Sequence, residues 1–148
     1  MIRRARPDDH PALVALMRAS NGYEAPAARA MIDGFTATWT YDQADEVWVL
    51  DGESGPAGFY QLIPHGEGDQ ELDLFFTDNA AQGQGVGRRL FEHMAERARA
   101  LGASRVMISS NPGAADFYRR MGARDAGTSP PAGDITWERP RFRLDLSN

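Results

Sequence analysis

Hydrophobic and polar positions alternate with a period of two in several segments of the chain, which predicts β-strands. Two such segments, residues 46–50 and 57–63, are joined by the turn-forming residues 51–56 and predict a hairpin. The remaining segments that we expect to form strands are residues 2–6, 71–77, 105–109 and 141–146.

Apolar residues at every third or fourth position predict helices elsewhere. The longest covers residues 86–101, and Gly102 is placed to end it. Shorter helices are expected over residues 7–21, 26–35 and 114–121. A strand at 71–77, a helix and a strand at 105–109 predict a right-handed crossover between parallel strands. Because the chain shows neither an internal repeat nor a linker, we expect a single mixed α/β domain over residues 1–148.

The composition excludes several kinds of chemistry. All 16 basic residues are arginine, and the chain contains neither lysine nor cysteine. Without cysteine there are no disulfides, thiolate metal sites or thiol nucleophiles, and without lysine there is no Schiff base or Walker phosphate loop. We therefore expect chemistry from carboxylates, Tyr, His, Ser, Thr, Arg or backbone amides, and we expect no bound metal.

The net charge of −5 is divided unevenly along the chain. Residues 1–80 hold fourteen acidic residues against five arginines, a net charge of −9, whereas residues 81–148 hold seven against eleven, a net charge of +4. The overall acidity and the lack of a continuous basic stripe disfavour nucleic acid as a partner.

The beginning of the chain predicts a location for the protein. Residues 1–9 start with basic side chains but no apolar run follows them, so we expect neither a signal peptide nor an anchor. No apolar stretch approaches the roughly 20 residues that span a bilayer. We expect a cytoplasmic protein that does not bind membranes.

A glycine-rich turn, Gln82-Gly83-Gln84-Gly85-Val86-Gly87, lies between the strand at 71–77 and the long helix. Its glycines allow a sharp turn and leave the backbone amides accessible. Together with the free amides of the helix's first turn, they predict a phosphate or pyrophosphate site, the alternative being a tight turn without a ligand. The Gly-x-Gly-x-x-Gly dinucleotide pattern fails, because Arg88 or Leu90 occupies its last position.

A second motif follows the glycine-rich turn. The first motif is Gln82-x-x-Gly85-x-Gly87-Arg88, and after a strand that ends at Asn111 comes Ala115-x-Phe117-Tyr118-x-x-x-Gly122. In this order, the two motifs resemble the signature of the GNAT superfamily of acetyl-CoA-dependent N-acetyltransferases, over residues 71–125. The resemblance implies a GNAT-type α/β fold: a central mixed, mostly antiparallel sheet with a parallel, splayed pair of strands at the cofactor site, and flanking helices.

The resemblance also implies how acetyl-CoA binds. Its pyrophosphate would lie on the amides of the glycine-rich turn, and its pantetheine arm would pair with the backbone of residues 75–77 like an added strand. The amide of Phe76 would donate to the thioester carbonyl, and Asn111 would bind the pantetheine or a nearby backbone group, or cap the next helix. The expected acetyl-CoA-binding residues are Phe75, Phe76, Thr77, Gln82, Gly83, Gln84, Gly85, Val86, Gly87, Arg88, Asn111, Phe117 and Tyr118.

Two proton movements are needed for acyl transfer to an amine. The resemblance places Tyr118 near the sulfur, as the acid that protonates it; the alternative is a tyrosine that only packs. Glu71 lies eleven residues before Gln82, the offset of the base in histone-modifying members, and strict alternation would put it on one strand face with Asp73 and Phe75. We expect Glu71 to be the base, directly or through water, and Asp73 is the runner-up.

Neighbouring carboxylates at positions 71 and 73 would raise one another's pKa, which suits a base working near neutral pH. The alternative is that they contact arginines or only bind a cationic substrate. His65, in the preceding loop, is a third candidate.

The expected activity is transfer of an acetyl group from acetyl-CoA to a primary amine in a ternary complex, because without cysteine the enzyme cannot hold the acetyl group on a thiol. The alternative is a non-catalytic acyl-CoA-binding or sensing domain. We interpret the basic second half as suited to the anionic cofactor and the acidic first half to a cationic small-molecule or peptide amine. Many such domains form homodimers, and the sequence favours neither state.

Overall fold

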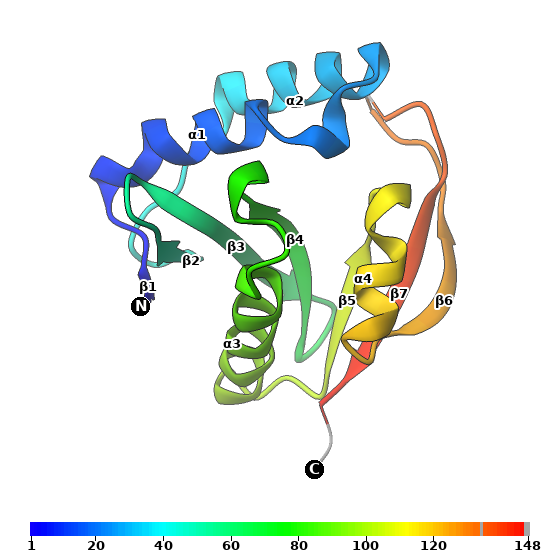
Figure 1. Cartoon of the computed structure of the whole chain (residues 1–148). Coiled ribbons are helices and arrows are strands. Elements are labelled where there is room, and N and C mark those ends of the chain that lie inside the picture. The colour runs from blue at the N-terminus through cyan, green and yellow to red at the C-terminus, as the bar shows by residue number, and fades with distance from the viewer. Residues whose placement is uncertain (134, 147–148) are drawn as a thin grey trace.

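The computed structural model describes residues 1–133 and 135–146, and its strands form one sheet in the order β1-β2-β3-β4-β5-β7-β6 (Figure 1). Among the described strands, β4 and β5 pair in parallel, and every other neighbouring pair is antiparallel. This confirms the predicted mixed, mostly antiparallel sheet. The strands are β1 (Ile2–Arg4), β2 (Glu46–Asp51), β3 (Pro56–His65), β4 (Asp69–Thr77), β5 (Arg105–Ser109), β6 (Arg124–Ser129) and β7 (Arg139–Asp145).

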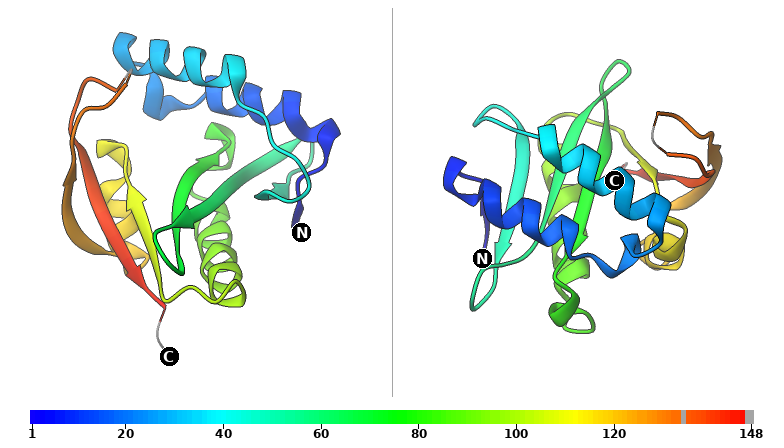
Figure 2. Two further views of the ribbon diagram at one scale, coloured as in Figure 1. Left: turned by 180° about the vertical axis from the view of Figure 1, so that it is seen from behind. Right: turned by 90° about the horizontal axis from the view of Figure 1, so that it is seen from above.

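Helices cover both faces of the sheet. Helices α1 and α2 lie side by side across one face, and α3 and α4 lie on the other (Figure 2). The helices are α1 (His10–Arg18), α2 (Pro26–Thr38), α3 (Val86–Ala100) and α4 (Ala115–Arg120), with short 3-10 turns η1 (Pro7–Asp9), η2 (Asn21–Tyr23), η3 (Asn79–Ala81) and η4 (Pro112–Ala114).

Two buried hydrophobic clusters hold these layers together. On the α1/α2 side, Leu13 and Ile32 belong to the same cluster as Phe59 of the sheet. On the α3/α4 side, Leu90 and other apolar residues of α3 share a cluster with residues of β3, β4, β5 and β7 that include Phe142. The apolar spacing read from residues 86–101 thus becomes the buried face of α3, which ends just before Gly102 as predicted.

Strands β4 and β5 pair over a short stretch and then separate. Residues 70–72 pair with residues 106–108, after which β4 continues to Thr77 while β5 ends at Ser109. On its other side β4 pairs with β3 along its whole length. Within the described residues, the β4 edge from Asp73 to Thr77 therefore has no neighbouring strand on the β5 side, as expected for a splayed parallel pair.

A bulge interrupts β4 at Asp73. Leu72 pairs with Leu62 and Leu74 pairs with Gln61, so Asp73 is an extra residue without a partner on β3. Such an insertion shifts the alternation of side chains beyond it.

Because of the bulge, the side chains of β4 lie on different faces of the sheet from those predicted. Leu72 and Phe75 both contact the cluster on the α3/α4 side, although strict alternation would place them on opposite faces. Leu74 and Phe76 contact the cluster on the α1/α2 side. The expectation that Glu71, Asp73 and Phe75 share one face of a regular strand is therefore wrong.

The sequence pattern did not predict β6. All of its residues except Ser129 are exposed, so it has no alternation of apolar side chains to reveal it. Its partner is β7, where Ser129 pairs with Arg139 and Arg124 with Arg143.

Candidate active site

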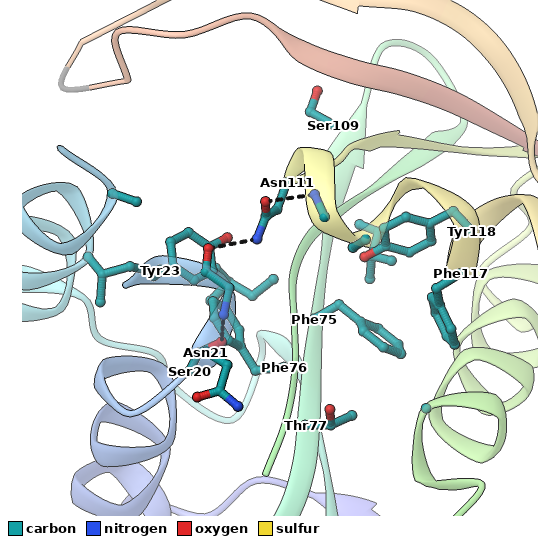
Figure 3. A pocket seen from close by; sticks show the side chains of 18 of the residues that line it. Ser20, Asn21, Tyr23, Phe75, Phe76, Thr77, Ser109, Asn111, Phe117 and Tyr118 are labelled. Atoms are coloured by element: carbon teal, nitrogen blue, oxygen red, sulfur yellow. Dashed lines mark hydrogen bonds between the residues drawn. The ribbon is translucent and has the colours of Figure 1, made fainter. Parts of the chain in front are cut away.

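A cavity of about 1130 Å³ lies where β4 and β5 diverge (Figure 3). Its walls come from β4, the glycine-rich turn with the start of α3, the η4–α4 segment, the η2–α2 segment and the hairpin between β6 and β7. The predicted site residues that line it are Asp73, Phe75, Phe76, Thr77, Gln82, Gly83, Gly85, Val86, Gly87, Arg88, Asn111, Phe117 and Tyr118. Gln84, Glu71 and His65 are not among the lining residues.

The backbone conformation of the glycine-rich turn suits the binding of an anion. Gly83 and Gly85 have φ angles of 82° and 79°, a region that favours glycine, and a Cβ at either would point into open space. Gly85 caps α3 without a side-chain hydrogen bond, and the amide of Arg89 is the first to bond back to it. The amides just before Arg89 are therefore free to bind a ligand at the positive end of the helix dipole. This arrangement fits a pyrophosphate.

Gly87 allows α3 and α4 to approach each other. A Cβ at this position would lie 3.0 Å from Cε1 of Phe117. Phe117 packs against Phe75 and Phe91, with ring centroids 5.6 and 6.0 Å apart. Phe117 thus forms part of the cavity wall and also joins α4 to α3.

The free edge of β4 presents backbone groups to the cavity. The amide of Asp78 donates to the carbonyl of Ala57 on β3, and hydrogen-bonded pairs alternate along antiparallel strands. This alternation directs the amide of Phe76 toward β3 and the amides of Phe75 and Thr77 toward the cavity. The amide of Phe76, expected to donate to the thioester, therefore faces β3, whereas the amides of Phe75 and Thr77 are the ones open to the cavity.

Tyr118 is buried, with 6% of its surface exposed, yet its hydroxyl points into the cavity (Figure 3). Its ring packs against Phe75, Phe117 and Phe142. Burial raises the pKa of Tyr118 well above its usual value, and the hydroxyl has no hydrogen-bond partner within the described part of the chain. The side chain is therefore a protonated donor at neutral pH.

The bulge brings Asp73 to the cavity wall. Neighbouring atoms of the wall desolvate its carboxylate, although solvent reaches it through the opening, and this desolvation raises the pKa of Asp73. The negative charge of Glu71 raises it further. A carboxylate with a raised pKa can take a proton from an ammonium group more readily than an ordinary one.

Glu71 lies beside the cavity rather than in its wall. It pairs with Ile63 on β3 and Met107 on β5, and its Oε1 lies 3.3 Å from Nδ1 of His65. Of the two carboxylate candidates, Asp73 lines the cavity, whereas Glu71 lies beside it and raises the pKa of Asp73 through its negative charge.

Two asparagines hold the loop that forms one rim of the cavity. Asn111 donates from Nδ2 to the carbonyl of Gly22 at 3.0 Å and accepts from the amide of Gly113, so it caps η4 as expected (Figure 3). Asn79 donates to the carbonyl of Ala19 and accepts from the amide of Asn21. The loop before α2 is therefore fixed to the ends of both diverging strands.

Sequence reasoning did not find the other end of the cavity. Helix α2 presents an apolar face there, and the segment before β7 places alternate residues toward the same space. Neither segment carries a motif, and only the helical spacing within residues 26–35 indicated an apolar face. The lining residues involved are Tyr23, Ala28, Met31, Ile32, Phe35, Ile135, Trp137 and Arg139.

The charges around the cavity differ from the interpretation based on the two halves of the chain. Among the described residues that line it, Asp73 is the acidic one, and Arg88, Arg120 and Arg139 are basic. Several other acidic residues of the first half, such as Asp9, pair with arginines elsewhere. The described residues therefore do not form the broad acidic groove expected for the amine.

Within residues 1–133 and 135–146, no group of three or more His, Asp or Glu residues is placed to hold a metal ion. None of the helices in these residues is long and apolar enough to cross a membrane.

Comparisons with known proteins agree on one family. The family model described as "Acetyltransferase (GNAT) domain" matches residues 43–122. A peptidyl-lysine N-acetyltransferase, YjaB of Salmonella typhimurium, is 29% identical over 132 residues, which cover 86% of each protein.

Solved structures share the fold at low sequence identity. A GCN5-related N-acetyltransferase from Rhodopseudomonas palustris superposes with a TM-score of 0.85 at 18% identity, over 99% of this chain and 95% of that one. An aminoglycoside 6'-N-acetyltransferase complexed with coenzyme A superposes with a TM-score of 0.75 at 12% identity, over 100% and 98%.

Proposed function

Because the chain belongs to the GNAT acetyltransferase family and is an acyltransferase, we propose that it transfers the acetyl group of acetyl-CoA to a primary amine. One observation carries this proposal: an anion-binding turn, a free strand edge, a buried tyrosine and a carboxylate of raised pKa all border one cavity. We further propose that residues 1–148 act as a single N-acetyltransferase domain.

The residues of the cavity support a binding mode for acetyl-CoA. The amides of Val86, Gly87 and Arg88 would hold the pyrophosphate, and the neighbouring glycines leave space for it. The pantetheine would lie along the free edge of β4 and bond to the backbone of Phe75 and Thr77. The solved neighbour that binds coenzyme A supports the choice of ligand.

We propose direct transfer with both substrates bound. The amine nitrogen bonds to the acetyl carbon as the carbon–sulfur bond breaks, coenzyme A leaves with a proton, and the amine loses one. The chain has no cysteine to carry the acetyl group between two half-reactions. The acceptor amine, a small molecule or a peptide, is cationic before it loses its proton.

Asp73 is the group that would take the amine proton, directly or through water. Its place in the cavity wall and its raised pKa both support this role. Glu71, the first candidate from the sequence, would support Asp73 through its charge.

Tyr118 would donate to the sulfur as it leaves. Its raised pKa keeps the hydroxyl protonated, which suits a donor and not a base. A non-catalytic sensing domain would not need a proton donor and a base in the same cavity. None of the described features of the cavity favours a sensing domain. The expectations of a cytoplasmic location and a homodimer stay predictions.

A substitution at Tyr118 tests the proposal. In Tyr118→Phe we expect acetyl transfer to an amine panel, measured as release of free coenzyme A, to fall by about a hundred- to a thousandfold, within the range for loss of an acid or a single donor. The dissociation constant of acetyl-CoA, measured by calorimetry, should stay within about twofold.

Tyr41→Phe is the matched control. Its hydroxyl donates to the carbonyl of Arg6, and Tyr41 is not among the lining residues of the cavity, so both transfer and binding should match wild type. If wild type binds acetyl-CoA but transfers to no amine, or if Tyr118→Phe is fully active, the proposed mechanism is wrong.

A further inference from the structure

We propose that the acceptor is a free amino acid with an apolar side chain, whose carboxylate is bound by Arg139 and whose amino group faces Asp73. The inference rests on the proposed function and names the substrate class of the same site. It is carried by the walls at the end of the cavity away from the glycine-rich turn.

Two apolar surfaces enclose that end. Residues 28, 31, 32 and 35 follow the spacing of one helical face, and all of them line the cavity. Ile135 and Trp137 also line the cavity, whereas Thr136 and Glu138, between and after them, are exposed. An apolar side chain placed between these surfaces would lose contact with water on both sides.

Arg139 continues the same alternation and contributes a positive charge to an otherwise apolar wall. Its Nε is buried and has no hydrogen-bond partner within the described residues. Among the same residues, no carboxylate forms an ion pair with its guanidinium. An arginine held in this way is suited to a carboxylate, which accepts two parallel hydrogen bonds from its planar fork. The positive charge of Arg139 also acts on Tyr23, where it partly offsets the rise in pKa that burial causes.

The other basic residues of the cavity belong to its cofactor end. Arg88 is in the first turn of α3 beside the glycine-rich turn, and Arg120 ends α4, so both suit the phosphates of acetyl-CoA. Arg139 begins β7, directly after the segment that contains Ile135 and Trp137, and is left for the acceptor.

The balance of charges narrows the class of acceptor. One carboxylate, Asp73, and one arginine, Arg139, match the ammonium and carboxylate of a zwitterion. A polycationic acceptor would need several carboxylates, and Asp73 is the acidic residue among the described lining residues. The apolar walls favour a hydrocarbon side chain over a polar one.

A comparison of acceptors tests the inference with wild-type enzyme. We expect kcat/KM, measured as coenzyme A release, to be about ten- to a hundredfold higher for L-phenylalanine, L-leucine or L-methionine than for glycine. Removing the carboxylate should cost a similar factor, so L-phenylalaninamide and 2-phenylethylamine should be poor acceptors. A lysine-containing peptide is included, and its preference over the amino acids would overturn the inference.

Arg139→Gln tests the carboxylate contact. It should raise KM for L-phenylalanine about ten- to a hundredfold, leave transfer to 2-phenylethylamine unchanged and leave the dissociation constant of acetyl-CoA unchanged. Arg139→Lys should recover part of the loss because it keeps the charge. Arg124→Gln, at an exposed position of β6 outside the cavity wall, is the control for the loss of one positive charge.

The outcomes separate this inference from the proposed function. Transfer to amines with no preference for a carboxylate, or an Arg139→Gln enzyme that behaves like Arg124→Gln, would overturn the acceptor class and leave acetyl transfer standing. A loss of acetyl-CoA affinity in Arg139→Gln would assign Arg139 to the cofactor and also overturn it. No transfer to any amine would refute the proposed function itself. Thermal unfolding of each variant shows whether it is folded.

Discussion

The position of Asp73 in the cavity wall, and with it the raised pKa of its carboxyl group, results from a one-residue bulge in β4. In a regular strand it would sit on the same face as Phe75, but the bulge makes it the unpaired residue at the point where β4 leaves β5. There it is partly desolvated and lies near a second negative charge. Bulges commonly redirect a side chain next to an active site, and this one gives the cavity wall its carboxylate.

Glu71→Gln distinguishes the two carboxylate candidates. If Asp73 is the base, removing the negative charge of Glu71 lowers the pKa of Asp73, and the acidic limb of the kcat/KM profile moves to lower pH. Activity on the plateau should change little. Asp73→Asn should abolish the limb and most of the activity.

The pH profile of Glu71→Gln can also contradict the assignment of Asp73 as the base. If Glu71→Gln loses its plateau activity instead, Glu71 is the base and Asp73 is not. Glu67→Gln, which removes an exposed carboxylate from the loop between β3 and β4, should leave both the limb and the plateau at their wild-type values.

At the scale of elements, the start of α3 depends on backbone conformation. Gly85 adopts a left-handed conformation as the N-cap, and a side chain there would project into the space expected for the pyrophosphate. Gly102, just after the same helix, has a similar φ of 84° but lies away from the cavity wall. The two glycines therefore share one source of strain and differ in their position relative to the ligand.

Alanine at each glycine separates strain from binding. Gly85→Ala and Gly102→Ala should each lower the free energy of unfolding by about 1–2 kcal/mol, measured by urea denaturation, because both force a left-handed conformation on an L-residue. Only Gly85→Ala should also weaken acetyl-CoA, by about tenfold or more in calorimetry. Equal affinity in the two variants would show that the turn does not hold the pyrophosphate.

The elements also show which features a sequence can reveal. The glycine-rich turn and the Phe117-Tyr118 pair each consist of neighbouring residues, so their local spacing was enough to identify residues that line the cavity. The bulge at Asp73 left no trace, because residues 71–76 alternate almost regularly and the extra residue appears only in the register with β3. Strand β6 was missed because pairing with β7, and not an apolar face, stabilises it.

Across the whole molecule, the end of the cavity lined by α2 and the segment before β7 could not be predicted, because its walls meet only in three dimensions. The face of α2 and the segment before β7 are separated by about a hundred residues of sequence, and neither contains a functional motif. The charge counts of the two halves do not describe the cavity, because an acidic residue of the first half such as Glu46 is paired with Arg97 of the second half, away from the cavity lining.

The stability of the whole molecule should depend on His93. The Nδ1 atom of His93 lies 2.7 Å from the hydroxyl of Tyr60, and its ring packs against Trp48. Burial lowers the pKa of His93, and the positive charge of Arg97 lowers it further. Because the unfolded chain then binds the proton more readily, stability is greatest above about pH 6.5 and falls as the pH drops below that value.

Urea unfolding between pH 7.5 and 5 measures this dependence. Wild type should lose stability toward pH 5, and His93→Gln should lose less over the same interval, although it starts from a lower value. The pKa of Glu46 is held at about 2, chiefly by Arg97, so the stability from that pair disappears only between about pH 4.5 and 2 and does not interfere. Parallel curves for the two proteins would contradict the role of His93.

The arrangement of the cavity walls along the chain has a consequence for how such enzymes diverge. In the proposed binding mode, residues 75–88 and 109–121 line the cofactor end of the cavity, whereas the acceptor end is formed by Asp73 and by residues 20–35 and 135–139, which lie on either side of the cofactor-binding segments in sequence. Substitutions in these outer segments can change the acceptor without touching the chemistry of the donor. A gene of this kind can duplicate and acquire a new substrate by drift at its two ends, while its middle stays under the old selection.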